Sequence, residues 1–166
     1  GIDKFAVAGN SMGAGVATRV ALDNPDRVTH LIQVDGGGMP SKLPREPGLG
    51  FRIARLPVIN QVMRWVSPRN LFEGGLKTAI YDDKIVTPDM VDMYWRLNRR
   101  EGTRAATLKR FNTPWDTYNA DNMSKIEMPT LILWGDKDTL IPPDSGEAAR
   151  DGARDRRREG GDAVDE

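Results

Sequence analysis

The residue best suited to covalent chemistry in this chain is Ser11, which stands at the centre of GNSMG at residues 9–13. An apolar run precedes this pentapeptide and a run of small residues follows it, which predicts a strand, a sharp turn and a helix. At Gly9 and Gly13 we expect a side chain to collide with the neighbouring strand or helix. Because a serine hydroxyl is a weak nucleophile, a turn that presents it clear of the backbone and within reach of a base favours its activation.

The helix expected after Ser11 adds a second part of the same chemistry. The first N–H groups of a helix lack acceptors within that helix and carry partial positive charge. We therefore expect the backbone N–H of Met12 to stabilise an oxyanion that develops on a substrate. The alternative is a glycine-rich turn in which the serine is incidental, but the strand before it and the helix after it favour the catalytic interpretation.

An acid that could serve such a serine lies far along the chain. Residues 126–135 predict a strand, and the turn that follows it contains Asp138. Open parallel sheets place their chemistry at the carboxyl ends of strands. An acid in this place can orient a histidine and stabilise its cation. We expect the neighbouring Asp136 to form the turn itself, since aspartate readily bonds its own backbone.

The elements around Ser11 predict an α/β fold with a parallel sheet. Residues 12–24 have the spacing of a helix that ends at Asn24-Pro25, and residues 27–34 predict a second, largely apolar strand that ends at Asp35. A strand, a helix and a strand in about thirty residues form a βαβ unit with a right-handed crossover.

The residues between the second and third strands contain several short helical patterns and no convincing strand. One helix is expected at residues 58–66, and a better-marked one begins at Pro88, with Thr87 as its N-cap, and ends at Gly102. Such a block would sit over the strand ends, so we expect a helical cap or lid over residues 39–122. Its methionine and aromatic residues are expected to pack the core and the lid, and some are candidates for lining an acyl pocket.

Composition limits the other classes of function. The chain has 166 residues, enough for a core of its own, with 24 basic and 24 acidic residues. Nothing in this balance indicates nucleic acid or an anionic membrane surface as a partner, and no apolar run approaches the ~18 residues of a membrane span. The absence of cysteine excludes disulfides and thiolate metal sites. We expect a soluble, cytoplasmic protein that acts on a small molecule and uses no cofactor and no metal.

The end of the chain differs from the rest. Residues 144–166 are dominated by charged and small residues, and they hold no aromatic residue and one large aliphatic residue, Val164. Such a segment buries too little apolar surface to offset its ordering entropy. We expect a disordered tail, or at most a solvated helix.

The order of these features resembles the α/β-hydrolase family over residues 2–143. The motifs that carry the resemblance are GNSMG, the NPDRV of residues 24–28, and the WGDKD turn of residues 134–138. The resemblance implies a partial α/β-hydrolase fold, with its core in residues 1–38 and 123–143 and the lid inserted between them. It also implies Ser11 as the nucleophile and Asp138 as the acid of the triad.

Two further expectations follow from the resemblance. Some family members use an acid at the end of the second strand seen here, so Asp35 is an alternative to Asp138. The GNSMG turn with a helical lid is similar to enzymes that cleave small esters, or C–C bonds of ring-fission products. A dehalogenase-like reaction is disfavoured, because it needs a carboxylate where Ser11 stands.

The histidine of the family is the part that this sequence does not supply. Family members have about four strands before the serine turn, and they carry the general base in a loop beyond the acid. The only histidine of the chain is His30, in the middle of the second strand and roughly 16 Å from its carboxyl end. We therefore expect a fragment that lacks the first strands and the histidine loop and is weakly active or inactive. The alternative is a non-catalytic binding module or pseudo-enzyme.

Overall fold

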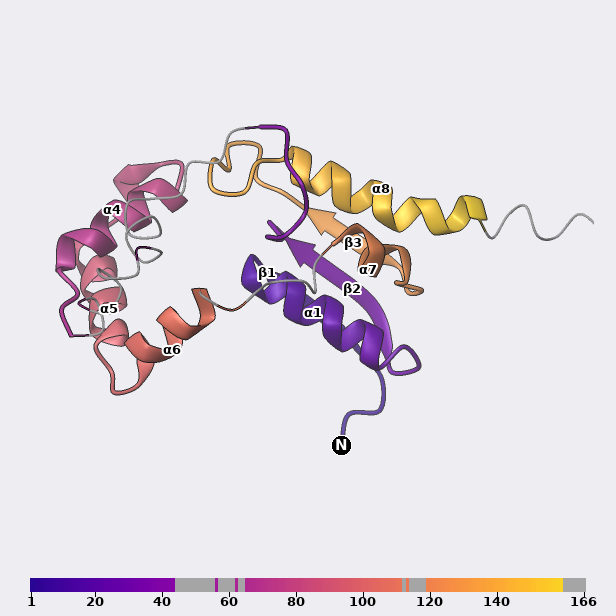
Figure 1. Cartoon of the computed structure of the whole chain (residues 1–166), viewed down its shortest axis with the longest axis horizontal. Coiled ribbons are helices and arrows are strands. Elements are labelled where there is room, and N and C mark those ends of the chain that lie inside the picture. The colour runs from indigo at the N-terminus through magenta and orange to yellow at the C-terminus, as the bar shows by residue number, and fades with distance from the viewer. Residues whose placement is uncertain (44–55, 57–61, 63–64, 112, 114–118, 160–166) are drawn as a thin grey trace, which may run out of the picture. The chain divides into compact units, whose positions relative to one another are not determined.

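The computed structural model describes residues 1–43, 56, 62, 65–111, 113 and 119–159. The chain divides into two compact units (Figure 1). The first consists of Gly1–Pro44 and Trp115–Glu166, and the second of Arg45–Pro114.

The first unit is built on a parallel sheet of three strands. Strand β1 spans Phe5–Asn10, helix α1 spans Met12–Asp23 and strand β2 spans Val28–Val34, which confirms the predicted βαβ unit. Strand β3, Thr130–Leu133, pairs with the other side of β2, so that the order is β1-β2-β3.

The register brings the three carboxyl ends of the strands to one edge of the sheet. Asn10 of β1 is paired with Val34 of β2, and Val34 is in turn paired with Leu133 of β3. The residues that follow each strand therefore leave the sheet side by side, and this is where an open parallel sheet holds its functional groups.

Small residues allow α1 to lie close to the sheet. Its buried face consists of Ala14, Gly15, Ala17, Thr18 and Ala21. This face contacts β1 and β2, and the core also receives Met123 from α7, Ala120–Ser124. Among the described residues, the core includes the fully buried side-chain amide of Gln33, which donates from Nε2 to Thr18 Oγ1 at 2.7 Å and to the sulfur of Met123 at 3.3 Å. These bonds offset the cost of burying a polar group.

The segment that begins at residue 144 is not the solvated or disordered tail that its composition predicted. Helix α8 spans Asp144–Glu159 and contacts both β3 and α7. The buried residues of its described part are Ser145, Gly146, Ala149 and Gly152. A Cβ added to Gly146 would lie 2.6 Å from the ring of Trp134, and one added to Gly152 would lie 3.2 Å from the backbone of Ala120. The expectation is wrong for this stretch because small residues pack by close approach and need no large aliphatic side chain.

All regular structure described in the second unit is helical. Helix α4 spans Arg69–Ala79, the 3-10 helix η1 spans Asp83–Ile85, α5 spans Pro88–Asn98 and α6 spans Thr103–Phe111. Of the helix expected at residues 58–66, residues 58–61 and 63–64 lie outside the described part of the chain.

Helix α5 begins as the sequence predicted and ends earlier. The Thr87 hydroxyl accepts a hydrogen bond from the Met90 N–H at 3.2 Å, which confirms the N-cap. The helix ends at Asn98 with Arg99 as its C-cap. Gly102, at which the helix was expected to end, has a φ of +76° and instead lies in the turn before α6.

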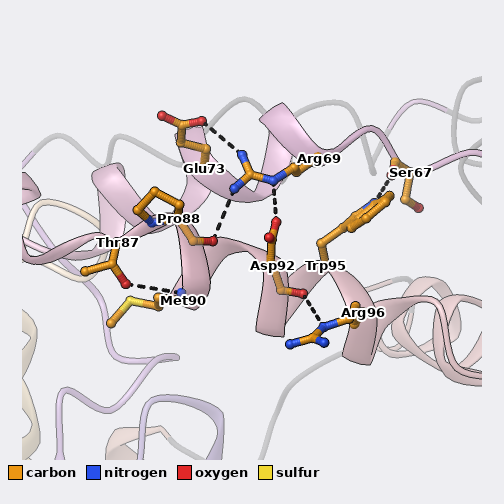
Figure 2. A network of polar contacts seen from close by, with 9 residues as sticks. All are labelled: Ser67, Arg69, Glu73, Thr87, Pro88, Met90, Asp92, Trp95 and Arg96. Atoms are coloured by element: carbon orange, nitrogen blue, oxygen red, sulfur yellow. Dashed lines mark hydrogen bonds and ion pairs between the residues drawn. The ribbon is translucent and has the colours of Figure 1, made fainter.

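A polar network joins α4 to α5 (Figure 2). The Arg69 guanidinium donates from Nε to Asp92 and from Nη2 to the carbonyl oxygen of Pro88, and its Nη1 lies 3.6 Å from Glu73. The indole N–H of Trp95 donates to the carbonyl oxygen of Ser67 at 2.8 Å. Val91 and Leu108 are the buried hydrophobic residues among those described in this unit, so these polar contacts supplement a small core.

Candidate active site

Ser11 has a backbone conformation that side-chain-bearing residues rarely adopt. Its φ is +50° and its ψ is −114°. Its N–H donates to the carbonyl oxygen of Val34 at 2.8 Å, which ties the turn to the end of the neighbouring strand. Unfavourable backbone conformations of this kind cost about 1–3 kcal/mol and cluster at functional sites.

Gly9 is required by this turn. A Cβ at Gly9 would lie 2.0 Å from the carbonyl oxygen of Gly13 and 2.3 Å from its carbonyl carbon. These are backbone atoms of the first turn of α1, so they could not move aside without opening the turn. The predicted collision is therefore confirmed at Gly9.

The same prediction is wrong at Gly13 for the described part of the chain. A Cβ built there meets nothing within 4 Å. The sequence pattern treats the two glycines alike, but in the structure only Gly9 has no room for a side chain. Gly13 supplies the carbonyl group that crowds Gly9, whereas its own α-carbon faces open space.

The start of α1 lies directly after Ser11. Met12 is the first residue of the helix, and the Ser11 hydroxyl makes no capping hydrogen bond to it. The helix thus begins without engaging the hydroxyl as a cap, and the positive end of the helix dipole lies beside the serine.

The turn after β3 holds Asp138 rigidly by one carboxylate oxygen. Asp138 Oδ1 accepts hydrogen bonds from the N–H groups of Leu140 and Ile141, each at 2.8 Å. The Asp138 N–H donates to the carbonyl oxygen of Gly135 at 3.2 Å. Among the described residues both side-chain bonds fall on Oδ1, so that Oδ2 is able to accept a hydrogen bond from an imidazole.

Asp35 lies between the serine turn and the acid turn. It has a positive φ of +46°, its N–H donates to the carbonyl oxygen of Leu133 at 3.1 Å, and its Oδ1 accepts from the N–H of Gly135 at 2.8 Å. Ser11, Asp35 and Asp138 therefore all follow strands that end at the same edge of the sheet.

His30 does not belong to this group. It pairs with Ala6 near the beginning of β1, four positions before the pair of Asn10 with Val34 that closes the ladder. Its side chain is exposed, and its Nδ1 lies 3.2 Å from the hydroxyl oxygen of Thr29.

Asp144 is a residue whose role the sequence did not indicate. Its carboxylate accepts hydrogen bonds from the Ser41 hydroxyl at 2.7 Å, from the Lys42 N–H at 2.6 Å and from the Leu43 N–H at 3.3 Å. The Ser41 hydrogen bond, followed by the backbone N–H groups, holds the pKa of the Asp144 carboxyl below its ordinary value. Asp144 thus fixes the segment that leaves the first unit after β2.

Two classes of site find no support in the described residues. No group of three or more histidine, cysteine, aspartate or glutamate side chains there is arranged to hold a metal ion. No helix in that part of the chain is both long and apolar enough to cross a membrane.

Comparison with known proteins gives the same fold as the geometry. A 2-hydroxy-6-oxononadienedioate/2-hydroxy-6-oxononatrienedioate hydrolase of Cupriavidus pinatubonensis is 31% identical over 154 residues, which cover 87% of this chain and 50% of the relative. The enzyme of the same name from Paraburkholderia xenovorans is 30% identical over 158 residues, with the same coverage. The chain thus spans about half the length of these relatives.

Solved structures share the fold of this chain. The meta-cleavage product hydrolase of Pseudomonas fluorescens IP01 superposes with a TM-score of 0.70 at 20% identity, over 90% of this chain and 53% of that one. The family model described as alpha/beta hydrolase fold matches residues 1–159. That match includes all of α8, the helix that composition alone had assigned to a tail. The chain therefore belongs to the alpha/beta hydrolase fold family.

Proposed function

We propose that this chain carries the nucleophile and the acid of a serine-dependent hydrolase. The observation that carries the proposal is the backbone conformation of Ser11, with a φ of +50° and a ψ of −114°. Ser11 lies at the carboxyl edge of the sheet, where the turn that holds Asp138 also lies. In this proposal Ser11 is the nucleophile, the N–H of Met12 stabilises the oxyanion, and Asp138 orients a histidine through Oδ2.

The reaction proposed is hydrolysis through a covalent acyl-enzyme. The Ser11 hydroxyl oxygen attacks the carbonyl carbon of the substrate while its proton passes to the base. The tetrahedral intermediate collapses with loss of the leaving group, which takes the proton, and water then cleaves the acyl-serine bond by the same steps. The helix dipole of α1 and the Met12 N–H lower the energy of the oxyanion both when the acyl-enzyme forms and when it is hydrolysed.

We propose a small carboxylic ester, or a related acyl or C–C bond, as the substrate class. The relatives from Cupriavidus and Paraburkholderia are named as hydrolases of 2-hydroxy-6-oxo-nonadienedioates, which supports the C–C bond as the first candidate. The ester is the second candidate, because a serine nucleophile beside an oxyanion-stabilising N–H suits acyl transfer in general.

The base is the part of the machinery that these residues do not bring to the site. The sequence has one histidine, and His30 lies near the opposite end of the ladder from Ser11. Loss of the base of such a triad costs several orders of magnitude in rate. We therefore propose that the 166-residue chain is weakly active or inactive by itself. The same observation favours a second candidate function, a non-catalytic module that binds a small acyl ligand.

A fluorophosphonate probe distinguishes the two candidates. We expect slow labelling at Ser11 that is lost in Ser11→Ala, unchanged in Ser124→Ala, and accelerated by added imidazole, which can replace a missing histidine as a diffusible base. Mass spectrometry of the labelled peptide identifies the serine. Failure to label folded protein, with or without imidazole, would contradict the catalytic proposal and favour the binding module.

A further inference from the structure

The Asp35 side chain takes part in the hydrogen bonds at the carboxyl edge of the sheet. The ladder across the carboxyl edge runs from the Ser11 N–H to the Val34 carbonyl oxygen and from the Asp35 N–H to the Leu133 carbonyl oxygen. Beyond Leu133 the strands have ended, and the next N–H to face β2 is that of Gly135.

The Asp35 side chain continues the ladder past this point. Its Oδ1 accepts from the Gly135 N–H at 2.8 Å, so the carboxylate stands where a carbonyl oxygen of a longer strand would be. Gly135 is also the residue whose carbonyl oxygen accepts from the Asp138 N–H. Val34 binds the Ser11 turn, and its neighbour Asp35 binds Gly135 in the turn that carries Asp138. These two adjacent residues therefore connect the two turns.

The backbone of Asp35 is adapted to this task. Its φ of +46° lies in the left-handed region, which aspartate and asparagine tolerate better than most other side-chain-bearing residues. In that conformation Asp35 bonds to β3 and to the following turn at once, through its own N–H and its own carboxylate. Its Oδ1 is thereby committed to the Gly135 N–H.

We propose that Asp35 is a positioning residue, whose Oδ1 fixes the Asp138 turn relative to the Ser11 turn. The inference rests on the proposed function for its catalytic meaning, because it assumes that Ser11 and Asp138 act together. Its structural part, the bond from Gly135 to Asp35, stands independently of any reaction.

Three substitutions at residue 35 separate the side-chain bond from the backbone conformation. Asp35→Asn keeps both an acceptor oxygen and tolerance of a positive φ. Asp35→Gly keeps the backbone conformation and loses the acceptor, whereas Asp35→Ala loses both.

Amide hydrogen exchange on the 166-residue chain provides the readout. We expect Asp35→Gly to lower the protection of Gly135, Leu140 and Ile141 by about tenfold, the effect of one lost hydrogen bond. Protection of Leu31 in the sheet should stay as in the wild type, and Asp35→Asn should restore the three turn amides to within about threefold. Unchanged protection in Asp35→Gly would overturn the proposal.

Labelling of Ser11 in the presence of imidazole tests the catalytic part. Compared with the wild type, labelling should be slower in Asp35→Gly and about as fast in Asp35→Asn. It should also be slower in Asp138→Asn, where the negative charge of the acid itself is lost. Labelling that is lost equally in Asp35→Asn would show that the charge of Asp35 is needed, and would restore it as an acid. If wild-type Ser11 is not labelled at all, the proposed function fails, while the exchange result still decides whether Asp35 positions the turn.

Discussion

At the scale of single residues, the positive φ of Ser11 is the clearest sign of chemistry in the described structure. A serine that merely capped α1 would bond its hydroxyl to the helix, and Ser11 does not. The turn is instead held by backbone groups, namely the bond from the Ser11 N–H to Val34 and the close approach of Gly13 to Gly9. The side chain is thus left available for reaction.

The two glycines of the turn are expected to respond differently to the same substitution. Gly9→Ala places a methyl group 2.0 Å from a backbone oxygen and should destabilise the fold by about 3 kcal/mol or more, as severe overpacking does. Gly13→Ala meets no atom within 4 Å and lies in the first turn of α1, so it should be neutral or stabilise by up to about 1 kcal/mol. Urea unfolding followed by circular dichroism measures both, and equal effects would contradict the assignment of the clash to Gly9.

Asp144 should give the stability of the protein a recognisable dependence on pH. Its carboxyl pKa is lower in the folded than in the unfolded chain, because the ionised form accepts hydrogen bonds from Ser41, Lys42 and Leu43. Such a group stabilises the fold above its unfolded pKa, and the contribution disappears as the pH falls through the folded pKa.

Comparison of the wild type with Asp144→Asn tests this. The urea midpoint of the wild type should exceed that of the variant at pH 7, and the difference should shrink below about pH 4. Asp26→Asn serves as the control, because Asp26 is exposed and lies in the turn after α1. A wild-type advantage that is the same at pH 3 and pH 7 would exclude the carboxylate as its source.

At the scale of elements, α8 shows how a polar helix becomes part of a core. Its composition is charged, but its small residues lie on the side that contacts Trp134 and α7. These residues are buried because the helix backbone lies close to its neighbours, so adding a single methyl group should lower the stability of the fold.

Alanine substitutions of helical glycines should therefore have opposite signs in α8 and α4. Gly146→Ala and Gly152→Ala should each destabilise by about 1–3 kcal/mol, because the added Cβ meets Trp134 and Ala120 closely. Gly74→Ala in α4 meets nothing within 4 Å and should stabilise its helix by up to about 1 kcal/mol. Thermal unfolding monitored at the α-helical signal measures the three variants, and stabilisation by Gly146→Ala would mean that α8 does not pack as described.

In the second unit, polar contacts join helices that bury few hydrophobic residues among those described. Arg69 of α4 binds two groups of α5, the Asp92 carboxylate and the Pro88 carbonyl oxygen, and also pairs with Glu73 in its own helix. The guanidinium fork suits this arrangement in a way that a lysine would not. In α5, Val91 is buried, whereas Tyr94 and Leu97, which follow it at three-residue spacing, are 47% and 42% exposed. Only the structure therefore shows which part of this apolar helix face is covered.

At the scale of the whole molecule, the chain joins a parallel βαβ core to a helical unit inserted before its third strand. The family match extends over residues 1–159 and the superposition on a meta-cleavage product hydrolase over 90% of the chain, so both include residues of the two units. The second compact unit spans residues 45–114, and the sequence predicted a cap or lid over residues 39–122. That this unit acts as a lid stays a prediction.

The sequence by itself determined the local features: the strand and helix on either side of Ser11, the N-cap at Thr87, and the place of Asp138 after a strand. These depend on neighbours within a few positions, where spacing and propensity act. Only the tertiary structure decided the bond between Gly135 and Asp35, the anchoring by Asp144 and the burial of the small residues of α8. The bonds from Gly135 to Asp35 and from Ser41 to Asp144 join residues 100 and 103 positions apart, and no local pattern specifies such pairs.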